Sequence, residues 1–327
     1  MTDGFGRTID YLRISVTDRC NLRCLYCMPK DGIPFYPHSE ILSFEEITRF
    51  TRIMADSGIK KIRLTGGEAL VRKDIEKLVY MLSEIPQIES LNMTTNALLL
   101  SDYSARLKSA GLKSVNVSLD TINSEHFKEL SGGGQLSSVL RGIDSALDQG
   151  LQVKINCVPV MGHNEDDIIA LCHFASEKKI DIRFIELMPI GKAVSCQGLS
   201  FKKLYENLQK SFGSEEKSEK IPEEEENHTI YYKFQKMNSR VGFIQPLTAS
   251  FCHKCNRIRL TADGFLKLCL HQKNGINVKS LLRGNKSNEE IKIAVQAAVD
   301  KKPASHTFLD AENARNSEER IMAQIGG

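Results

Sequence analysis

Residues 12–27, LRISVTDRCNLRCLYC, join the pattern of a β-strand to three closely spaced cysteines. In the first half, apolar and polar side chains alternate, which places them on opposite faces of a strand. In the second half, Cys20, Cys24 and Cys27 follow in a C-x3-C-x2-C spacing. The strand therefore leads directly into a loop whose three thiols could act together at one metal centre.

Residues 12–17 are the first of six β-rich runs that are separated by helical patterns. One of these helices is predicted to begin at the N-cap residue Ser43 and to end near Gly58. Such alternation is typical of parallel strands with helical crossovers, and so of the α/β class. Six units are too few for a closed eight-stranded barrel, which leaves an open partial barrel or a doubly wound sheet. The runs cover residues 12–17, 60–65, 89–95, 113–119, 151–158 and 181–188.

The strands have a polar face as well as an apolar one. In the fourth run, for example, Val115 and Val117 alternate with Asn116 and Ser118. Parallel strands that are covered on both sides are usually apolar throughout. We therefore expect the face turned away from the helices to line a space that holds a large polar ligand. A solvent-exposed sheet face would explain one or two such strands, but explains four poorly.

A second region begins near residue 190, where the strand–helix repetition stops. A helical pattern at 201–212 is followed by the acidic stretch 213–229, which is typical of a solvated loop. Two further β-like runs lead from there to a second group of cysteines. The sequence thus predicts two domains, residues 1–190 and residues 191–327.

The composition is that of an ordinary globular protein. Of 327 residues, 26% are charged and 7% are aromatic, and the formal net charge is only +3. No apolar run approaches the ~18 residues of a transmembrane helix. The first residues resemble neither a signal peptide nor a transit peptide. We expect a cytoplasmic protein that binds neither a membrane nor nucleic acid.

Six of the nine cysteines fall into two groups of three. In a reducing compartment, such groups are more typical of metal centres than of disulfides. Three thiolates can hold three irons of a [4Fe–4S] cluster and leave the fourth iron open to another ligand. A structural zinc site is closed by four ligands, and the nearest further candidate after Cys27 is His38. The first group therefore favours an iron–sulfur cluster.

The second group of cysteines leaves both metals open. His253 or His271 could complete a zinc site, whereas three thiolates alone again suit a cluster with an open iron. Arg257 and Arg259 lie within this group, and arginine is suited to phosphate recognition. The pattern indicates a cluster beside a site for a phosphorylated substrate. The group comprises Cys252, Cys255 and Cys269; the other cysteines, interpreted as small buried apolar residues, are Cys157, Cys172 and Cys196.

The spacing of the first three cysteines resembles the signature of the radical S-adenosylmethionine (SAM) superfamily, as does Tyr26 before the last of them. The Gly-Gly-Glu after strand 60–65 resembles the superfamily motif for the amino group of SAM. More closely, the chain resembles the molybdenum-cofactor biosynthesis protein A family, the GTP 3′,8-cyclases, from about residue 4 to the C-terminus. The segments that carry this resemblance are LRISVTDRCNLRCLYCMP, KKIRLTGGE, NVSLD, VKIN, RFIELMPIG, FCHKCNRIRLTADG with Cys269, and the terminal IGG.

The resemblance implies a six-stranded (β/α)6 partial TIM-type barrel with a C-terminal capping region. It also implies two [4Fe–4S] clusters, of which the first cleaves SAM and the second binds the guanine base of GTP. The positions that match SAM contacts are Tyr26, Gly66, Gly67, Glu68, Ser118 and Met188. Those that match GTP contacts are Arg13, Arg63, Thr94, Lys154, Arg257 and Arg259, and the tail implied to reach the active site is Gly326-Gly327.

The activity implied by the resemblance is the conversion of GTP to (8S)-3′,8-cyclo-7,8-dihydro-GTP in molybdenum cofactor biosynthesis. A 5′-deoxyadenosyl radical takes hydrogen from ribose C3′, C3′ then bonds to guanine C8, and reduction of the resulting radical by one electron and one proton gives the product. The resemblance further implies an electron donor of unknown identity and product transfer to a downstream cyclic pyranopterin monophosphate synthase, and it allows a homodimer. The strand-borne cations suit this substrate, because a triphosphate carries about four negative charges.

Two positions depart from the family pattern. Ala69 replaces the proline after Gly-Gly-Glu, and the loss of this rigid residue should loosen the loop that holds Glu68. Ala97 replaces the glycine after Thr-Thr-Asn, and a positive φ there would strain alanine. Residues 191–200 also differ from the usual family sequence. We expect the activity to be kept with reduced efficiency.

Three other functions compete with this one. A peptide-modifying radical SAM enzyme with an auxiliary cluster would share the first cluster, but it would not predict the Arg-x-Arg pair or the terminal Gly-Gly. A zinc-stabilised binding protein, for example for nucleic acid, would be colourless and would expose a basic, aromatic surface. A catalytically weakened homologue would differ from the active enzyme only in substrate turnover.

Overall fold

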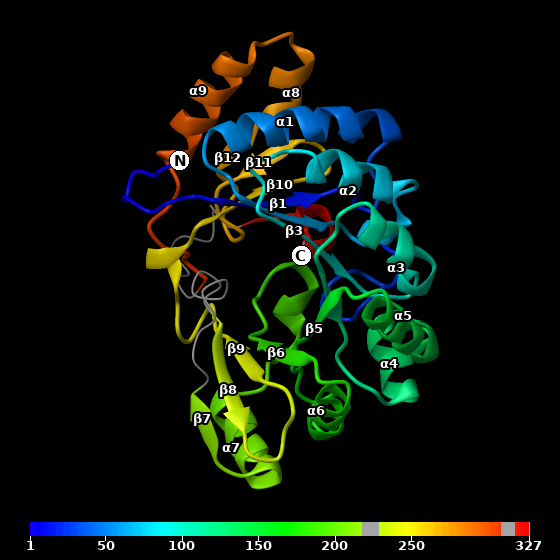
Figure 1. Ribbon diagram of the computed structural model, residues 1–327. Helices are drawn as coiled ribbons and strands as arrows, with labels where there is room; N and C mark the ends of the chain where they lie inside the picture. Colours follow the sequence, from blue (N-terminus) through cyan, green and yellow to red (C-terminus); the bar gives the residue numbers. More distant parts are fainter. Residues whose placement is uncertain (218–228, 309–317, 327) are drawn as a thin grey trace.

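The computed structural model describes residues 1–217, 229–308 and 318–326. Six neighbouring parallel strands form its centre, and helices cover their outer face (Figure 1). All six predicted strands are present, with ends shifted by a few residues. They are β1 (Tyr11–Ser15), β2 (Lys61–Thr65), β3 (Ser90–Thr95), β4 (Ser114–Ser118), β5 (Gln152–Cys157) and β6 (Asp181–Ile185).

Helices connect each of these strands to the next and pack their apolar sides on the sheet. The first of them begins at Ser43 as predicted, because the Ser43 side chain accepts a hydrogen bond from the Glu46 N–H and the Glu46 carboxylate accepts one from the Ser43 N–H. This capping box satisfies N–H groups that have no partner within the helix. The helices are α1 (Phe44–Asp56), α2 (Ile75–Ser83), α3 (Leu100–Ser109), α4 (Ser124–Ser131), α5 (Leu136–Asp148) and α6 (Ile168–Glu177).

The core lies between the helices and the apolar face of the sheet. On β1, Leu12 and Ile14 are fully buried in this core, whereas Arg13 between them lines a cavity on the opposite face. The alternation seen in the sequence therefore separates a helix-covered apolar side from a polar interior.

The strands after residue 190 extend the same sheet at both of its edges. One group joins the free edge of β6 and the other joins that of β1, and the strands at the two ends of the order are not paired with each other, so the barrel is open. All strands of the described residues belong to this sheet, and the division into domains at residue 190 remains a prediction. The elements are α7 (Phe201–Phe212), β7 (Glu215–Lys217), β8 (Ile230–Phe234), β9 (Val241–Ile244), β10 (Arg257–Leu260), β11 (Phe265–Lys267), β12 (Gly275–Asn277), α8 (Val278–Arg283), α9 (Asn288–Val299) and α10 (Met322–Ile325).

The later elements flank the barrel on two sides. Figure 1 shows α8 and α9 beside α1, and α7 with β7–β9 beyond β6. Within the described ranges, no helix combines the length and the apolar character needed to cross a lipid bilayer.

Candidate active site

One cavity extends along the polar face of the sheet from the first cysteine group to the second. The predicted polar interior is therefore present, and most predicted site residues meet in it. Those that line the cavity are Arg13, Cys20, Cys24, Tyr26, Cys27, Arg63, Gly66, Gly67, Glu68, Thr94, Ser118, Met188, Cys252, Cys255, Arg257, Arg259 and Cys269.

Of the predicted site residues that the structure describes, two are not part of this lining. Lys154 lies on β5 in register with Asn116, and its ammonium nitrogen is 5.5 Å from the centre of the Tyr231 ring. Gly326 lies next to the cavity, at the ends of β1 and β2. Gly327 lies outside the described residues.

The first cysteine loop follows β1 and rests on the end of α4. The N–H groups of Arg23 and Leu25 donate to the carbonyls of Ser131 and Leu130 at 2.8 and 2.9 Å. A Cβ atom at Gly132, where φ is +70°, would lie 2.8 Å from the Arg23 carbonyl oxygen. The end of a helix therefore fixes the loop at close range, and only glycine allows the approach.

The chemistry of the first three thiols fits an iron–sulfur cluster. Burial raises the pKa of Cys20 to about 11 and that of Cys27 to about 12. Burial also raises the pKa of Cys24 well above its ordinary value. Buried thiols are costly to ionise alone, and bound iron offsets this cost, since thiolates are its ligands in such clusters.

Tyr26 is held in place by a partly buried carboxylate, Asp120, that the sequence did not single out. Its hydroxyl donates to Asp120 Oδ2 at 2.6 Å, while the Val158 N–H donates to Oδ1 at 2.8 Å. Burial raises the pKa of Asp120 from 3.8 to about 6. Asp120 is the last residue of the NVSLD segment. Its position directly after a strand with a polar inner face could have identified it as a site residue.

The two glycines after β2 run against the chain before the first cysteine. A Cβ atom at Gly66 would lie 2.8 Å from the Thr17 carbonyl oxygen, and one at Gly67 would lie 2.4 Å from that of Arg19. Glycine is required at this spacing because any side chain would displace one of the two backbones.

Glu68 is firmly held although Ala69 follows it. The Leu70 N–H and the Thr95 hydroxyl donate to Oε1, and the Asn96 N–H donates to Oε2 at 2.6 Å. Burial raises the pKa of Glu68. The expected positive φ at Ala97 is observed, at +62°, so this alanine does occupy a backbone region that favours glycine.

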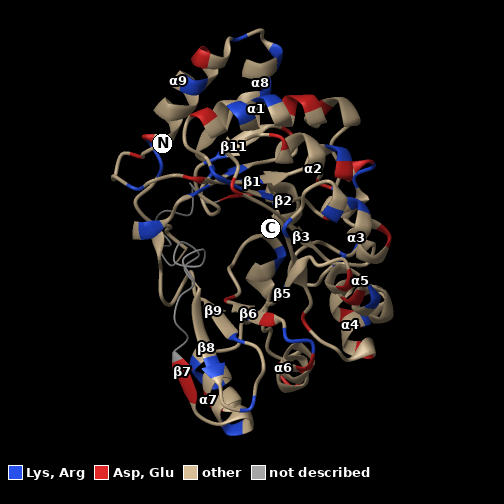
Figure 2. Cartoon of the chain, viewed as in Figure 1, with Lys and Arg blue, Asp and Glu red and all other residues tan. Residues whose placement is uncertain are grey.

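Arginines that line the cavity gather where three neighbouring strands meet. Arg13 on β1 is in register with Arg63 on β2 and with Arg259 on β10. Burial and the facing arginines lower the pKa of Arg259 to about 10 and that of Arg13 well below its ordinary value. Arg63 is only 9% exposed, and its Nη1 has no hydrogen-bond partner among the described residues. In Figure 2, blue segments that mark Lys and Arg lie on the central strands. Such a cluster of positive charges favours the binding of a polyanion.

Sequence reasoning missed Arg183 on β6, which also lines the cavity. Its Nε donates to Asn156 Oδ1 at 2.9 Å, and burial lowers its pKa. Arg183 alternates with the core residues Ile182 and Phe184, so the pattern that identified the polar faces of the other strands also applied here.

The second cysteine group lies at the other end of the cavity, around the start of β10. Burial raises the pKa of Cys255, but Lys302 and the Arg257 N–H lower it more, so that it ends below the ordinary value. His271, a possible zinc ligand in the sequence, has its Nε2 3.2 Å from the Thr307 hydroxyl and its ring against Phe308. Among the described residues, no group of His, Cys, Asp and Glu is arranged to hold a single metal ion.

The C-terminal tail enters between the arginines and the glycine-rich loop. Arg259 Nη1 donates to the Gly326 carbonyl at 2.9 Å. A Cβ atom at Gly326, where φ is +88°, would lie 2.6 Å from Thr65 Oγ1. The tail thus reaches the interior and needs glycine to do so.

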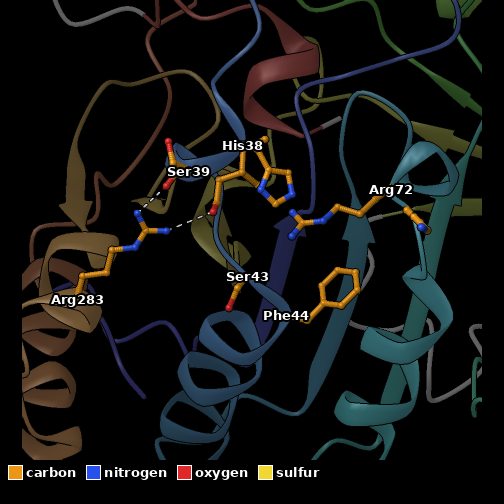
Figure 3. Close-up of a pocket in the computed structure, with 8 residues that line it drawn as sticks. His38, Ser39, Ser43, Phe44, Arg72 and Arg283 are labelled. Carbon is orange, nitrogen blue, oxygen red and sulfur yellow. Dashed lines mark hydrogen bonds between the residues drawn. The ribbon is translucent and has the colours of Figure 1, made fainter.

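A second depression, on the surface, is lined partly by His38 (Figure 3). Its arginines already have partners: Arg72 donates to the carbonyls of Val16 and Leu42, and Arg283 forms an ion pair with Glu46 at 2.6 Å. This depression therefore does not resemble an anion site.

Two family models match the chain: the Radical SAM superfamily over residues 14–175 and Molybdenum Cofactor Synthesis C over residues 180–308. The chain is 41% identical to the GTP 3′,8-cyclase of Clostridium perfringens and 44% identical to that of Pelotomaculum thermopropionicum, over the full length of all three. The chain belongs to the GTP 3′,8-cyclase family.

Solved structures share the fold of this GTP 3′,8-cyclase family member. Streptococcus suis SuiB bound to S-adenosylmethionine has a TM-score of 0.60 at 17% identity, covering 90% of this chain and 67% of SuiB. Native anSMEcpe with bound AdoMet has a TM-score of 0.59 at 17% identity, covering 91% and 82%. The expectation of an α/β partial barrel is confirmed; at these identities the likeness concerns the fold alone.

Proposed function

We propose that this chain is a radical SAM GTP 3′,8-cyclase, a lyase that converts GTP to (8S)-3′,8-cyclo-7,8-dihydro-GTP in molybdenum cofactor biosynthesis. The observation that carries this proposal is one cavity with three cysteines at each end and buried arginines between them. A nucleoside triphosphate matches this arrangement, because the arginines would neutralise its phosphates while its base and ribose lie towards the two cysteine groups.

The N-terminal end of the cavity would bind SAM. The first cysteine group would hold a [4Fe–4S] cluster, which supplies the electron that splits SAM into methionine and a 5′-deoxyadenosyl radical. Asp120 would fix the Tyr26 ring beside the cofactor, and Glu68 would face its amino group. The residues proposed to contact SAM are Tyr26, Gly66, Gly67, Glu68, Ser118 and Met188.

The C-terminal end would bind GTP. The second cysteine group fits a further [4Fe–4S] cluster because it offers three sulfur ligands to the cavity while His271 is engaged by Thr307. An iron without a protein ligand would remain available to guanine. The residues proposed to hold the triphosphate are Arg13, Arg63, Thr94, Lys154, Arg257 and Arg259, with Arg183 beside them.

The tail would complete the site. By contacting Arg259 and closing over Thr65, Gly326 would help to keep water from the reacting ribose. The same proposal includes three partners. They are an electron donor, a downstream cyclic pyranopterin monophosphate synthase that receives the product, and a second copy of the chain in a homodimer.

The number of clusters is the first test. The protein is reconstituted with iron and sulfide without oxygen, and iron and labile sulfide are measured in the wild type and in a Cys252→Ser/Cys255→Ser/Cys269→Ser variant. We expect about eight irons per chain to fall to about four. Four irons in both proteins, with zinc only in the wild type, would contradict the second cluster and the GTP cyclase function with it.

The reaction is the second test. GTP, SAM and dithionite are added to the reconstituted protein, and 5′-deoxyadenosine and the cyclised nucleotide are followed by mass spectrometry. Both should form in equal amounts, and neither should form with the Cys20→Ser variant. Cleavage of SAM without GTP cyclisation would favour a peptide-modifying enzyme, and trace turnover with both clusters present would favour a weakened homologue.

A further inference from the structure

Tyr11 is a buried side chain of the cavity to which the proposed function gives no role. It is 5% exposed and lies on the inward face of β1, two residues before Arg13. Arg63 Nε donates a hydrogen bond to its hydroxyl. The guanidinium carbon of Arg257 lies 5.7 Å from the centre of its ring and 5.7 Å from that of Phe251. The phenol therefore holds two of the arginines proposed to bind phosphate.

The surroundings of the Tyr11 hydroxyl are strongly cationic. Burial raises the pKa of Tyr11, but Arg63, Arg13 and Arg257 together lower it more, to about 8. Lys61, in register with Tyr11 on β2, lies 3.8 Å from Asp10 and is partly neutralised by it. The charged groups that face Tyr11 from the packed strands are Arg13 on β1, Arg63 and Lys61 on β2, Arg257 and Arg259 on β10, and Arg183 on β6.

We propose that Tyr11 is a positioning residue for the substrate's polyphosphate, whose hydroxyl holds Arg63 in place in the empty site and must carry its proton when the polyphosphate binds. This inference rests on the proposed function, since it takes the arginines to be the triphosphate site.

The reason is competition for the same guanidinium groups. In the empty cavity, an ionised Tyr11 supplies a negative charge that the arginines favour. A triphosphate brings about four negative charges to these arginines, so a phenolate beside it becomes unfavourable. Above pH 8 the empty protein must therefore take up a proton as the nucleotide binds, and the affinity must fall as the pH rises.

The test measures nucleotide affinity against pH in the reconstituted protein without SAM. GTP and ATP are both used, because ATP carries the same triphosphate on a base that does not titrate in this range. The wild type is compared with Tyr11→Phe, which keeps the ring under Arg257 and removes only the hydroxyl. Tyr80→Phe, the same change at a 56% exposed residue, is the control.

The dissociation constant of the wild type and of Tyr80→Phe should rise about tenfold for each pH unit above about pH 8. That of Tyr11→Phe should be higher than the wild-type value at pH 7, because Arg63 loses its hydrogen-bond acceptor. It should stay constant above pH 8, with unchanged iron content. A flat wild-type profile, or the same slope in Tyr11→Phe, would overturn the inference.

The outcome separates this inference from the proposed function. Binding with the expected slopes but without cyclised product would support the role of Tyr11 and contradict the GTP cyclase function. Cyclised product with a flat affinity profile would do the reverse. If neither nucleotide bound at neutral pH, both would be overturned.

Discussion

Asp120 illustrates how burial changes the properties of a single side chain. It accepts hydrogen bonds from Tyr26 and Val158, and its partial burial disfavours the charged form. Its position after a predicted strand could be read from the sequence. Its contact with Tyr26, 94 residues away in the chain, could not, because it depends on how the loop of the first cysteines folds back over β4.

The effect of Asp120 on stability should depend on pH. Its pKa in the folded protein, about 6, lies above its ordinary value of 3.8, so folding should become more favourable as the pH falls from about 7 to about 4. The gain from this residue alone would be about 3 kcal/mol. Unfolding of the cluster-free protein in urea at several pH values would measure it, with Asp120→Asn as the comparison. Parallel pH profiles for the two proteins would contradict the prediction.

Ala97 is a second residue of interest, because its backbone conformation is unfavourable for alanine. Its φ of +62° is unfavourable for a side chain with a Cβ atom. We expect Ala97→Gly to raise the free energy of unfolding by up to about 1 kcal/mol, because glycine removes this strain. Ala110→Gly, at an ordinary φ of −76°, should lower it instead. Thermal unfolding of both variants would check the difference in sign.

Among the structural elements, α4 has an importance that its own sequence does not reveal. Its last carbonyls bind the loop of the first cysteines, and Gly132 ends it with a left-handed turn directly beneath Arg23. The helix itself was part of the predicted strand–helix alternation. Its use as a support for the cysteine loop follows from packing between distant parts of the chain.

Gly132→Ala should therefore impair the first cluster. A methyl group would lie 2.8 Å from the Arg23 carbonyl oxygen and push the loop away. We expect reconstitution to give about four irons per chain instead of about eight, with the second cluster retained. Gly133→Ala is the matched control, since φ there is also positive, at +116°, but no atom lies within 4 Å of the added methyl group. Equal iron loss in both variants would point to backbone strain rather than to contact with the loop.

Across the whole molecule, the C-terminal tail connects β11 with the interior of the barrel. Glu318 forms a buried ion pair with Lys267 on β11, and Gly326 reaches Arg259 and Thr65 further along. The family resemblance predicted that the Gly-Gly end reaches the active site. It did not predict the ion pair between Glu318 and Lys267 that anchors the preceding part of the tail.

Removal of this anchor should release the tail. In Lys267→Met, the carboxylate of Glu318 would stay buried without its partner. Such a loss typically lowers the free energy of unfolding by about 3–5 kcal/mol. Hydrogen exchange and proteolysis within residues 318–326 should then increase. Lys273→Met is the control, because its partner Glu319 is 84% exposed and such surface pairs contribute little. Equal exposure of the tail in the two variants would show that the buried pair is not the anchor.

The sequence by itself determined the six strands, their polar inner faces and the two cysteine groups. These features are local: side-chain direction alternates along a strand, and ligand spacing is counted along the chain. Only the tertiary structure decided which cations meet, because contact between Tyr11, Arg63 and Arg257 depends on the pairing of β1 with β2 and with β10, strands that lie far apart in sequence. The same holds for Arg183, for the bond between Tyr26 and Asp120 and for the docked tail, since strand register and burial arise only when distant segments pack together.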